Sequence, residues 1–257
     1  MITYFSACLF FLQLNMAENS KKTYLISELS VFFPAYNEEK NIKDTVEKCI
    51  AILEEITPKW EVIIVDDGST DNTGRVSQKL VDKYKGLVRI ITHSPNRGYG
   101  GALKSGLYGC KYNWIVFTDS DGQFDFSEIY HFIDTAKTQK ADLVIGYRLK
   151  REDPLARLVI AGMLKIWNFI FYKSRFKDAD CGFKLVKKEV VDKIPLLQTE
   201  SAITETEFLI RAKKAGFKIV EIGVRHFPRK EGSQTGSNPK VILKAIRESF
   251  NLWKALH

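Results

Sequence analysis

The sequence has few cysteines, and they form no recognisable pattern. The four cysteines of this 257-residue chain are widely spaced, form no C-x-x-C pair and have no histidine cluster beside them. Structural zinc sites and disulfide frameworks both depend on closely spaced cysteines, so neither is expected here. Unpaired thiols are usual in the cytosol, and we therefore predict a cytoplasmic protein.

No apolar run is long and uninterrupted enough to span a bilayer comfortably. The uncharged stretch ITYFSACLFFLQL covers only residues 2–14, whereas a spanning helix needs about 20 apolar residues. It also lacks the N-terminal positive charge of a signal peptide. We expect residues 1–25 to be an extension outside the fold, residues 26–230 to form one domain and residues 231–257 to form a basic amphipathic helix.

Two nucleotide-binding signatures are absent as well. The chain has neither the G-x-x-x-x-G-K-[ST] phosphate loop nor a G-x-G-x-x-G turn after its first predicted strand. These absences argue against a kinase, an ATPase or a dehydrogenase.

Excess charge is missing from most of the chain. The first 210 residues hold 28 basic and 28 acidic residues, whereas residues 211–257 hold 11 Lys and Arg against 3 Glu, which accounts for the net charge of +8. A basic region suits polyanions such as anionic lipid head groups or phosphorylated substrates, although a solvated surface is the simpler interpretation. Aromatic residues are few there and no recognition motif occurs, so we expect no nucleic-acid partner.

Short continuous apolar runs alternate with helical patterns up to Arg148. We predict strands at 29–33, 60–65, 87–92, 112–122 and 141–148, with a further strand in 217–227. Such runs indicate an α/β fold whose mostly parallel sheet is covered by helices on both faces. Ligands bind these sheets at the carboxyl ends of the strands. We expect Asn37 to cap the helix that follows the first strand.

Residues 154–176 have the pattern of a long apolar helix, interrupted by Arg157 and Lys165. Its aromatic residues and the basic residues near its end suit a helix that lies in the membrane interface. A core helix or a dimer face is the alternative. The segment NPKVILKAIRESFNLWKAL at the C-terminus also predicts an apolar stripe beneath basic residues.

Paired carboxylates follow the fourth predicted strand. Asp119 and Asp121 would repel each other unless a cation is bound between them. A hard divalent cation, Mg²⁺ or Mn²⁺, would supply that charge and leave coordination sites for substrate phosphates, with Gln123 as a neutral oxygen ligand. The D-x-D spacing alone is common in loops, but a second acidic pair, Asp66 and Asp67, ends a neighbouring strand. The sequence therefore predicts a metal site at Asp119, Asp121 and Gln123.

One member of the second acidic pair is a candidate nucleoside ligand. Asp67 is suited to accept hydrogen bonds from a nucleoside, whereas Asp66 is suited to cap the turn that comes next. The Gly-rich segment NRGYGGA, residues 96–102, could bind phosphate with its backbone N–H groups.

Four motifs together resemble those of the inverting GT-A glycosyltransferases. They are PAYNEE, VDDGSTDNT, NRGYGGAL and DSDGQ, in this order within residues 29–148. The motifs IGYR, DADCGFKL and RHFPRKEGSQTG further resemble the polyprenyl-phosphate sugar transferases, a group that includes dolichol-phosphate mannosyltransferase. With these the resemblance extends over residues 29–250. It implies the GT-A fold, which is Rossmann-like.

The resemblance implies roles for individual residues. The donor would be bound by Pro34, Tyr36, Glu38, Val65, Asp67, Ser120 and Gln123. Asp119 and Asp121 would hold the metal and act in catalysis together with Arg148 and Arg229, which would bind phosphate groups. The weaker candidates for the acceptor phosphate are Arg157, Lys230 and Gln234. The family often has a lysine near the position of Gln234.

The implied reaction transfers a hexose from GDP-mannose or UDP-glucose to a dolichyl or undecaprenyl phosphate, with inversion. The lipid phosphate oxygen would attack the anomeric carbon directly. Because a phosphate monoester is already anionic at neutral pH, positioning matters more than a general base. The implied partners are the nucleotide-sugar, the lipid phosphate, and the cytoplasmic face of a membrane or a membrane partner protein.

Two other functions stay open. A soluble transferase with a hydroxyl acceptor would need a carboxylate base, for which Glu205 or Glu207 is available. A non-catalytic sugar-nucleotide-binding protein would not need the intact DSDGQ motif or Arg148, so this interpretation is the weaker one.

Overall fold

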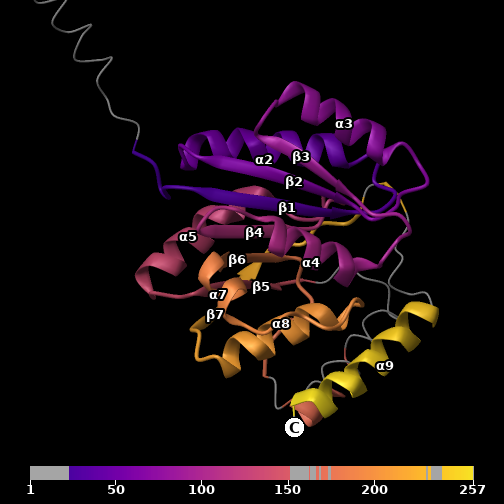
Figure 1. The fold of residues 1–257 in the computed structure, drawn as a ribbon. Helices are drawn as coiled ribbons and strands as arrows, with labels where there is room; N and C mark the ends of the chain where they lie inside the picture. Colours follow the sequence, from indigo (N-terminus) through magenta and orange to yellow (C-terminus); the bar gives the residue numbers. More distant parts are fainter. Residues whose placement is uncertain are drawn as a thin grey trace, which may run out of the picture.

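The computed structural model describes residues 23–150, 175–229, 231–232 and 239–256, together with residues 162, 166, 167 and 169–172. In this part of the chain, seven strands form one sheet in the order β3-β2-β1-β4-β6-β5-β7 (Figure 1). The strands are β1 (Leu29–Ala35), β2 (Trp60–Asp66), β3 (Val88–Thr92), β4 (Trp114–Thr118), β5 (Leu143–Arg148), β6 (Phe183–Lys187) and β7 (Ile219–Val224).

β1 lies inside the sheet and pairs in parallel with β2 and β4. Every residue of β1 and β2 is buried, because helices cover both faces of these strands. β6 runs antiparallel between β4 and β5, while β5 pairs in parallel with β7. The mostly parallel α/β sheet predicted from the apolar runs is therefore confirmed, and β6 is the strand that the prediction lacks.

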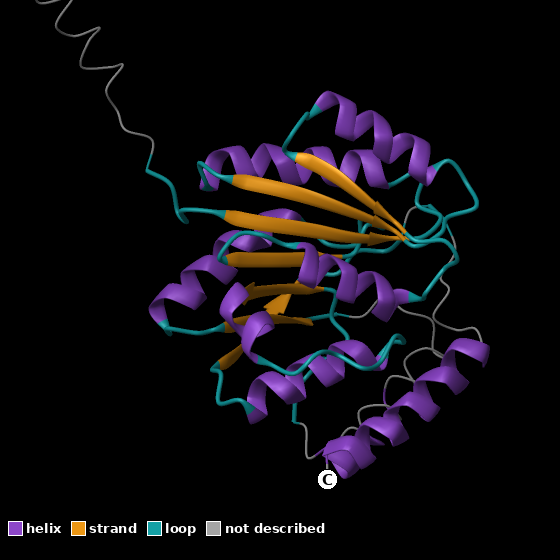
Figure 2. Ribbon diagram, viewed as in Figure 1, coloured by secondary structure: helices purple, strands orange, loops and turns teal. Residues whose placement is uncertain are grey.

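Helices form two apolar cores, one on each face of the sheet (Figure 2). The helices are α2 (Ile42–Ile56), α3 (Thr73–Lys83), α4 (Tyr99–Gly109), α5 (Ile129–Thr138), α7 (Lys188–Lys193), α8 (Ile203–Lys214) and α9 (Pro239–Leu256), with a short 3₁₀ helix at Phe126–Glu128. α2, α3 and α5 pack in the core that contains Phe33, and α4, α7 and α8 pack in the core that contains Phe32. Successive strand residues point to opposite faces, so these two phenylalanines belong to different cores.

The predicted cap of α2 is wrong. The helix begins at Ile42, with Asn41 before it, and Asn37 has a left-handed backbone with φ of 57°. The side-chain oxygen of Asn37 instead accepts a hydrogen bond of 2.8 Å from the backbone N–H of Thr70. Asn37 therefore links the loop after β1 to the loop after β2.

The loops after β1, β2 and β4 meet at one edge of the sheet. Ala35 and Asp66 are paired at the carboxyl ends of β1 and β2, where the arrowheads converge in Figure 2. The hydroxyl of Ser120, two residues beyond β4, donates a 2.7 Å hydrogen bond to the carbonyl of Pro34. This edge is where ligand binding is expected in a parallel sheet.

α9 packs beside α8 and lies within residues 231–257, for which the sequence predicts a basic amphipathic helix (Figure 1). Most of the predicted helix at 154–176 lies outside the described residues, and its described members include Trp167 and Tyr172, which are helical. The Trp167 indole N–H donates a 2.6 Å hydrogen bond to the Ser249 hydroxyl of α9, and the Tyr172 hydroxyl donates to the Ser249 carbonyl at 2.5 Å. Among the described residues, no helix combines the length and apolar character needed to cross a bilayer.

Candidate active site

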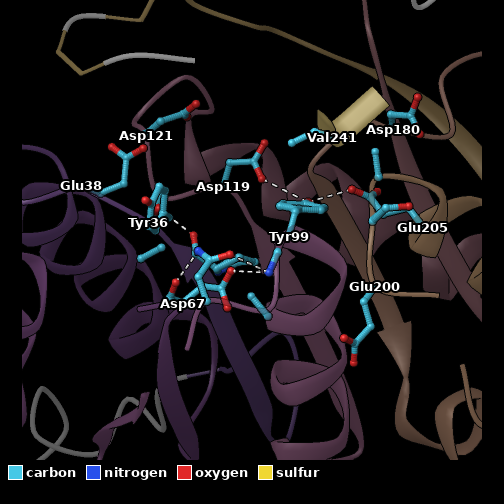
Figure 3. A pocket seen from close by; sticks show the side chains of 18 of the residues that line it. Tyr36, Glu38, Asp67, Tyr99, Asp119, Asp121, Asp180, Glu200, Glu205 and Val241 are labelled. Atoms are coloured by element: carbon cyan, nitrogen blue, oxygen red, sulfur yellow. Dashed lines mark hydrogen bonds between the residues drawn. The ribbon is translucent and has the colours of Figure 1, made fainter. Parts of the chain in front are cut away.

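A cleft of about 560 Å³ opens at the carboxyl ends of the strands (Figure 3). This volume is within the range of small-molecule sites. Ten of the predicted site residues line it: Pro34, Tyr36, Glu38, Asp67, Asp119, Ser120, Asp121, Gln123, Arg148 and Arg229. Val65, a predicted donor contact, is fully buried in the core and is not part of the lining. The predicted acceptor residues Arg157, Lys230 and Gln234 lie outside the described residues.

Asp119 and Asp121 reach the cleft from the loop after β4 (Figure 3). Burial raises the pKa of the Asp119 carboxyl to about 8, and the nearby carboxylates of Asp121 and Glu205 add to this rise. Gly182 lies directly against Asp119, so that a Cβ at position 182 would overlap the Asp119 carboxylate. The glycine of the DADCGFKL motif is thus required for the close approach of the loop that carries Asp119.

Arg229, from the chain after β7, is paired with two acidic residues of the cleft. One guanidinium nitrogen donates to Glu38, and Nη1 lies 3.4 Å from Asp121 Oδ2. Burial raises the pKa of Glu38, while hydrogen bonds from Asn41 and Arg229 oppose this rise. Arg229 therefore supplies positive charge beside Asp121, where the sequence predicts a metal.

A metal site at Asp119 and Asp121 fits the residues present. Within the described residues, no cluster of three or more His, Cys, Asp or Glu side chains forms a complete metal site. Mg²⁺ needs only one or two carboxylates when substrate phosphates complete its coordination. Asp121 and Glu205 lie close enough to Asp119 to raise its pKa, and a cation bound at Asp119 and Asp121 would offset this negative charge. The side-chain N–H of Gln123 donates to the Phe227 carbonyl at 2.8 Å, and its role as a ligand stays a prediction.

Asp67 organises the Gly-rich loop after β3. Its carboxylate accepts hydrogen bonds from the backbone N–H groups of Arg97, at 2.9 Å, and Gly98, at 2.8 Å. The buried His93 ring lies 2.6 Å from the same carboxylate. The role of Asp67 in nucleoside binding stays a prediction. Asp66 accepts from the N–H three residues later at 3.0 Å, which is the capping role expected for it.

Tyr99, the first residue of α4, connects two acidic groups (Figure 3). Its hydroxyl donates to Glu205 Oε1 at 2.7 Å and lies 3.3 Å from Asp119 Oδ1. The other Glu205 oxygen accepts from the ammonium of Lys184, a fully buried residue of β6. A buried lysine is tolerated when it is paired in this way. Tyr99 and Lys184 both lie in motifs singled out in the sequence, NRGYGGAL and DADCGFKL, but the sequence analysis gives neither residue a role.

Arg148 is held by a bidentate ion pair. Its Nε and Nη2 lie 2.7 Å and 2.8 Å from the carboxylate oxygens of Asp178, the first residue of DADCGFKL. Such a pair holds the plane of the guanidinium. Asp180 of the same motif lines the cleft, and burial raises its pKa to about 6, with Glu205 and Asp178 adding to the rise. Binding of phosphate by Arg148 stays a prediction.

The far wall of the cleft comes from the segment before α8 and from α9. Glu200, Val241 and Lys244 line it, and Figure 3 labels the first two. Glu200 lies 2.5 Å from Arg97 and 2.9 Å from Lys104. Although burial opposes them, these hydrogen bonds lower the pKa of Glu200 to about 2. The sequence contains no local signal that connects these residues with the cleft.

The model of one protein family, glycosyl transferase family 2, matches residues 30–194. The chain belongs to glycosyl transferase family 2. The matched range begins within β1 and includes the loop of Asp119 and Asp121 as well as the DADCGFKL motif. The resemblance noted in the four sequence motifs is therefore confirmed.

Several curated proteins are similar to this family 2 chain. The dolichyl-phosphate β-glucosyltransferase of Saccharomyces cerevisiae is 36% identical over 219 residues, which cover 76% of this chain and 66% of the yeast protein. The human protein of the same name is 31% identical, with coverages of 80% and 69%. The dodecaprenyl-phosphate galacturonate synthase of Rhizobium johnstonii is 28% identical, with coverages of 80% and 60%. The chain thus spans slightly less than two thirds of the length of its yeast relative.

Solved structures confirm the fold of this family 2 member. Glucosyl-3-phosphoglycerate synthase from Mycobacterium tuberculosis, in a complex with Mn²⁺, UDP and glucosyl-3-phosphoglycerate, superposes with a TM-score of 0.69. The sequences are 18% identical, and the match covers 89% of this chain and 80% of the synthase. The fold is the GT-A fold, as the sequence motifs imply.

Proposed function

We propose that the chain transfers a hexose, with glucose as the first candidate, from a nucleotide-sugar to the phosphate of a polyprenyl lipid. Three relatives, from yeast, Dictyostelium discoideum and human, are dolichyl-phosphate β-glucosyltransferases, and a fourth uses dodecaprenyl phosphate by its name. UDP-glucose is the favoured donor because these names specify glucose and a protein of the same fold binds UDP with Mn²⁺. GDP-mannose is the alternative donor.

The charge of the cleft is the observation that carries this proposal. Seven carboxylates and three cations line it in the described part of the chain. A bare diphosphate would be repelled by such a surface, whereas a divalent cation held by the carboxylates would neutralise the diphosphate and let it bind. A bound Mg²⁺ or Mn²⁺ would offset the charge that develops on the leaving nucleoside diphosphate. Asp119 and Asp121 are the residues that would hold it.

The chain's own residues would bind and orient the two substrates. The acceptor phosphate oxygen forms a bond to the anomeric carbon as the bond from this carbon to the nucleoside diphosphate breaks, which inverts the configuration. Arg148 and Arg229 would orient phosphate groups for this in-line attack. Arg229 would exchange its present partners, Glu38 and Asp121, for a phosphate when the donor and metal bind.

Glu205 and Glu207, the two candidate bases, already have hydrogen-bond partners within the protein, and this favours a phosphate acceptor. Glu205 has one oxygen bonded to Tyr99 and the other to Lys184. Glu207 is completely buried and accepts hydrogen bonds from Thr199 and Arg211. A phosphate monoester needs no base, so neither glutamate is required to accept a proton.

Asp180 supports a second candidate function, transfer to a hydroxyl acceptor. It lines the cleft, and burial raises its pKa to about 6. A carboxylate with a pKa near the working pH is suited to general-base catalysis. The acceptor in that case would be a glycan or another alcohol.

A peripheral membrane contact is part of the proposal. Leu243, Ile246 and Phe250 lie on one stripe of α9 and are 69%, 45% and 42% exposed. Residues 169 and 170, next to α9, are Phe and Ile, and both are also more than half exposed. An apolar stripe on a basic helix suits the interface of an anionic bilayer. The free, buried Cys49, Cys110 and Cys181 suit its cytoplasmic face.

Replacing Leu243 with glutamate should lower binding to anionic lipid vesicles by about tenfold, because an apolar side chain is lost from the bilayer interface and a charge is added. The measurement is co-sedimentation of the full chain with phosphatidylglycerol vesicles. Leu87→Glu is the matched control, since Leu87 is 40% exposed just before β3, an edge strand that Figure 1 shows well away from α9. Equal binding by the Leu243 variant and wild type would remove α9 from the membrane contact.

The proposed activity should appear as transfer of labelled glucose from UDP-glucose to a polyprenyl phosphate in the presence of Mg²⁺ or Mn²⁺. Label would move into the organic phase, and neither the metal-chelated reaction nor the unphosphorylated polyprenol should give product. GDP-mannose in a parallel reaction tests the alternative donor. Transfer to a glycan hydroxyl, with no lipid product from either donor, would replace the proposal by the second candidate function.

A further inference from the structure

α9 has three stripes of side chains with different surroundings. Residues at spacings of three and four lie on one side of a helix. The first stripe is buried and consists of Ala245, Ser249 and Leu252. The second is exposed and apolar and consists of Leu243, Ile246 and Phe250. The third faces the cleft or the segment before α8 and consists of Val241, Lys244 and Glu248.

Lys244 lies on the cleft-facing stripe and is held by weak contacts. Its ammonium donates to the carbonyls of Arg97, at 3.3 Å, and Glu200, at 3.4 Å. Both distances are near the upper limit for a hydrogen bond. The Glu248 carboxylate lies 4.0 Å away, and almost half of the Lys244 side chain is exposed. The ammonium can therefore change partners at low cost.

The other cations of the cleft are held more tightly. Arg148 has two contacts of 2.7 and 2.8 Å to Asp178, and Arg229 is paired with Glu38 and Asp121. Of the three cations that line the cleft in the described part of the chain, Lys244 has the longest distance to a carboxylate. An anionic ligand that binds Lys244 would therefore disrupt weaker ion pairs than one that binds Arg148 or Arg229.

We propose that Lys244 binds the phosphate group of the acceptor lipid, an inference that rests on the proposed function. Lys244 is adjacent in sequence to Leu243 of the exposed apolar stripe, so one turn of α9 contributes both to the cleft and to the proposed membrane contact. The phosphate of a membrane lipid is at the level of the head groups, where a lysine next to an inserted leucine would also be. The donor diphosphate belongs instead with Asp119 and Asp121, on the loop after β4.

The test is the affinity of the full chain for farnesyl phosphate, a short prenyl phosphate that needs no bilayer, measured by titration calorimetry. Lys244→Ala should weaken binding by about 10- to 100-fold, as expected for a charged hydrogen bond. Lys244→Arg should restore most of the affinity, and the affinity for UDP with Mg²⁺ should be unchanged in both variants. Lys254→Ala is the matched control, because Lys254 is an exposed lysine in the last turn of the same helix.

The outcomes separate this inference from the proposed function. An unchanged affinity of Lys244→Ala for farnesyl phosphate would overturn the role of Lys244, even if wild type transfers sugar to lipid. An equal loss of affinity for UDP would also overturn it, because Lys244 would then belong to the donor site. A selective loss of farnesyl phosphate binding, without transfer by wild type in the activity assay, would support Lys244 and overturn the transferase proposal. Absence of binding by wild type would overturn both.

Discussion

Replacing Asp119 with asparagine should lower the rate of sugar transfer by about a thousandfold and, in the absence of metal, make the protein more stable. The loss of rate follows if Asp119 holds a cation at the leaving diphosphate, since such a contact contributes several kcal/mol to the transition state and roughly 1.4 kcal/mol corresponds to a factor of ten. Asparagine keeps the shape of the side chain but removes its charge. The rate is measured in the lipid-transfer assay with saturating metal.

The gain in stability follows from the raised pKa of the Asp119 carboxyl. Its ordinary value of 3.8 is raised to about 8 by burial and by the neighbouring carboxylates. Between these two pH values the folded protein keeps a proton that the unfolded chain has released. The free energy of unfolding of the metal-free protein should therefore fall as the pH rises from about 4 to about 8. Asp180, with a pKa raised to about 6, adds to this decrease in the lower part of the range.

Urea unfolding in a chelator at several pH values measures this effect. The Asp119→Asn variant should lose less stability than wild type as the pH rises. Asp134→Asn is the control, because Asp134 is an exposed residue of α5. A variant that is inactive and also less stable than wild type at pH 8 would mean that Asp119 supports the fold. Full activity of the variant would exclude Asp119 from the metal site.

Replacing Glu207 with alanine should destabilise the protein by about 3–5 kcal/mol, the usual cost of removing one partner of a buried ion pair. Glu207 is completely buried on α8. Its carboxylate accepts from the backbone N–H groups of Gln198 and Thr199, both at 2.9 Å, and from Arg211 at 2.7 Å. Alanine would leave the Arg211 guanidinium and two backbone donors without this acceptor. The free energy of unfolding is measured in urea.

Glu189→Ala provides the matched control for this second prediction. Glu189 is half-exposed on α7 and pairs with Lys193, so its loss should cost no more than about 1 kcal/mol. The Glu207 variant that remains folded should transfer sugar at a rate within a few fold of wild type, since its role is structural. A stable variant with a large loss of rate would contradict this and would return Glu207 to the candidate bases.

The sequence predicts the part of this fold that local patterns determine. β1 and β2 are continuous apolar runs, as expected for strands that are buried on both faces. α2 has apolar residues at helical spacing, as expected for a helix that is buried on one side. β6 has the sequence FKLVK, in which Lys184 interrupts the apolar pattern. Lys184 is nevertheless fully buried, because Glu205 pairs with it from α8. A strand that depends on a partner about twenty residues away gives no local signal.

The candidate site is predictable to the same extent. The motifs identify the loop of Asp119 and Asp121 and the arginine of the chain after β7, because each motif is compact in sequence. The Asn37 cap fails because the side chain bonds to a loop that is distant in sequence. Lys244 escapes prediction for a related reason: only the packing of α9 brings it to the cleft.

The three stripes of α9 tie lipid contact, core packing and cleft geometry to a single helical register. Each residue added to a helix rotates all the later residues by about 100° around the helix axis. A residue inserted between Lys244 and Ala245 would leave Ala245 in the core only if Lys244 rotated away from the cleft. Relatives in which this helix has the same function should therefore differ freely in the identity of single residues here, but hardly at all in the number of residues between the stripes.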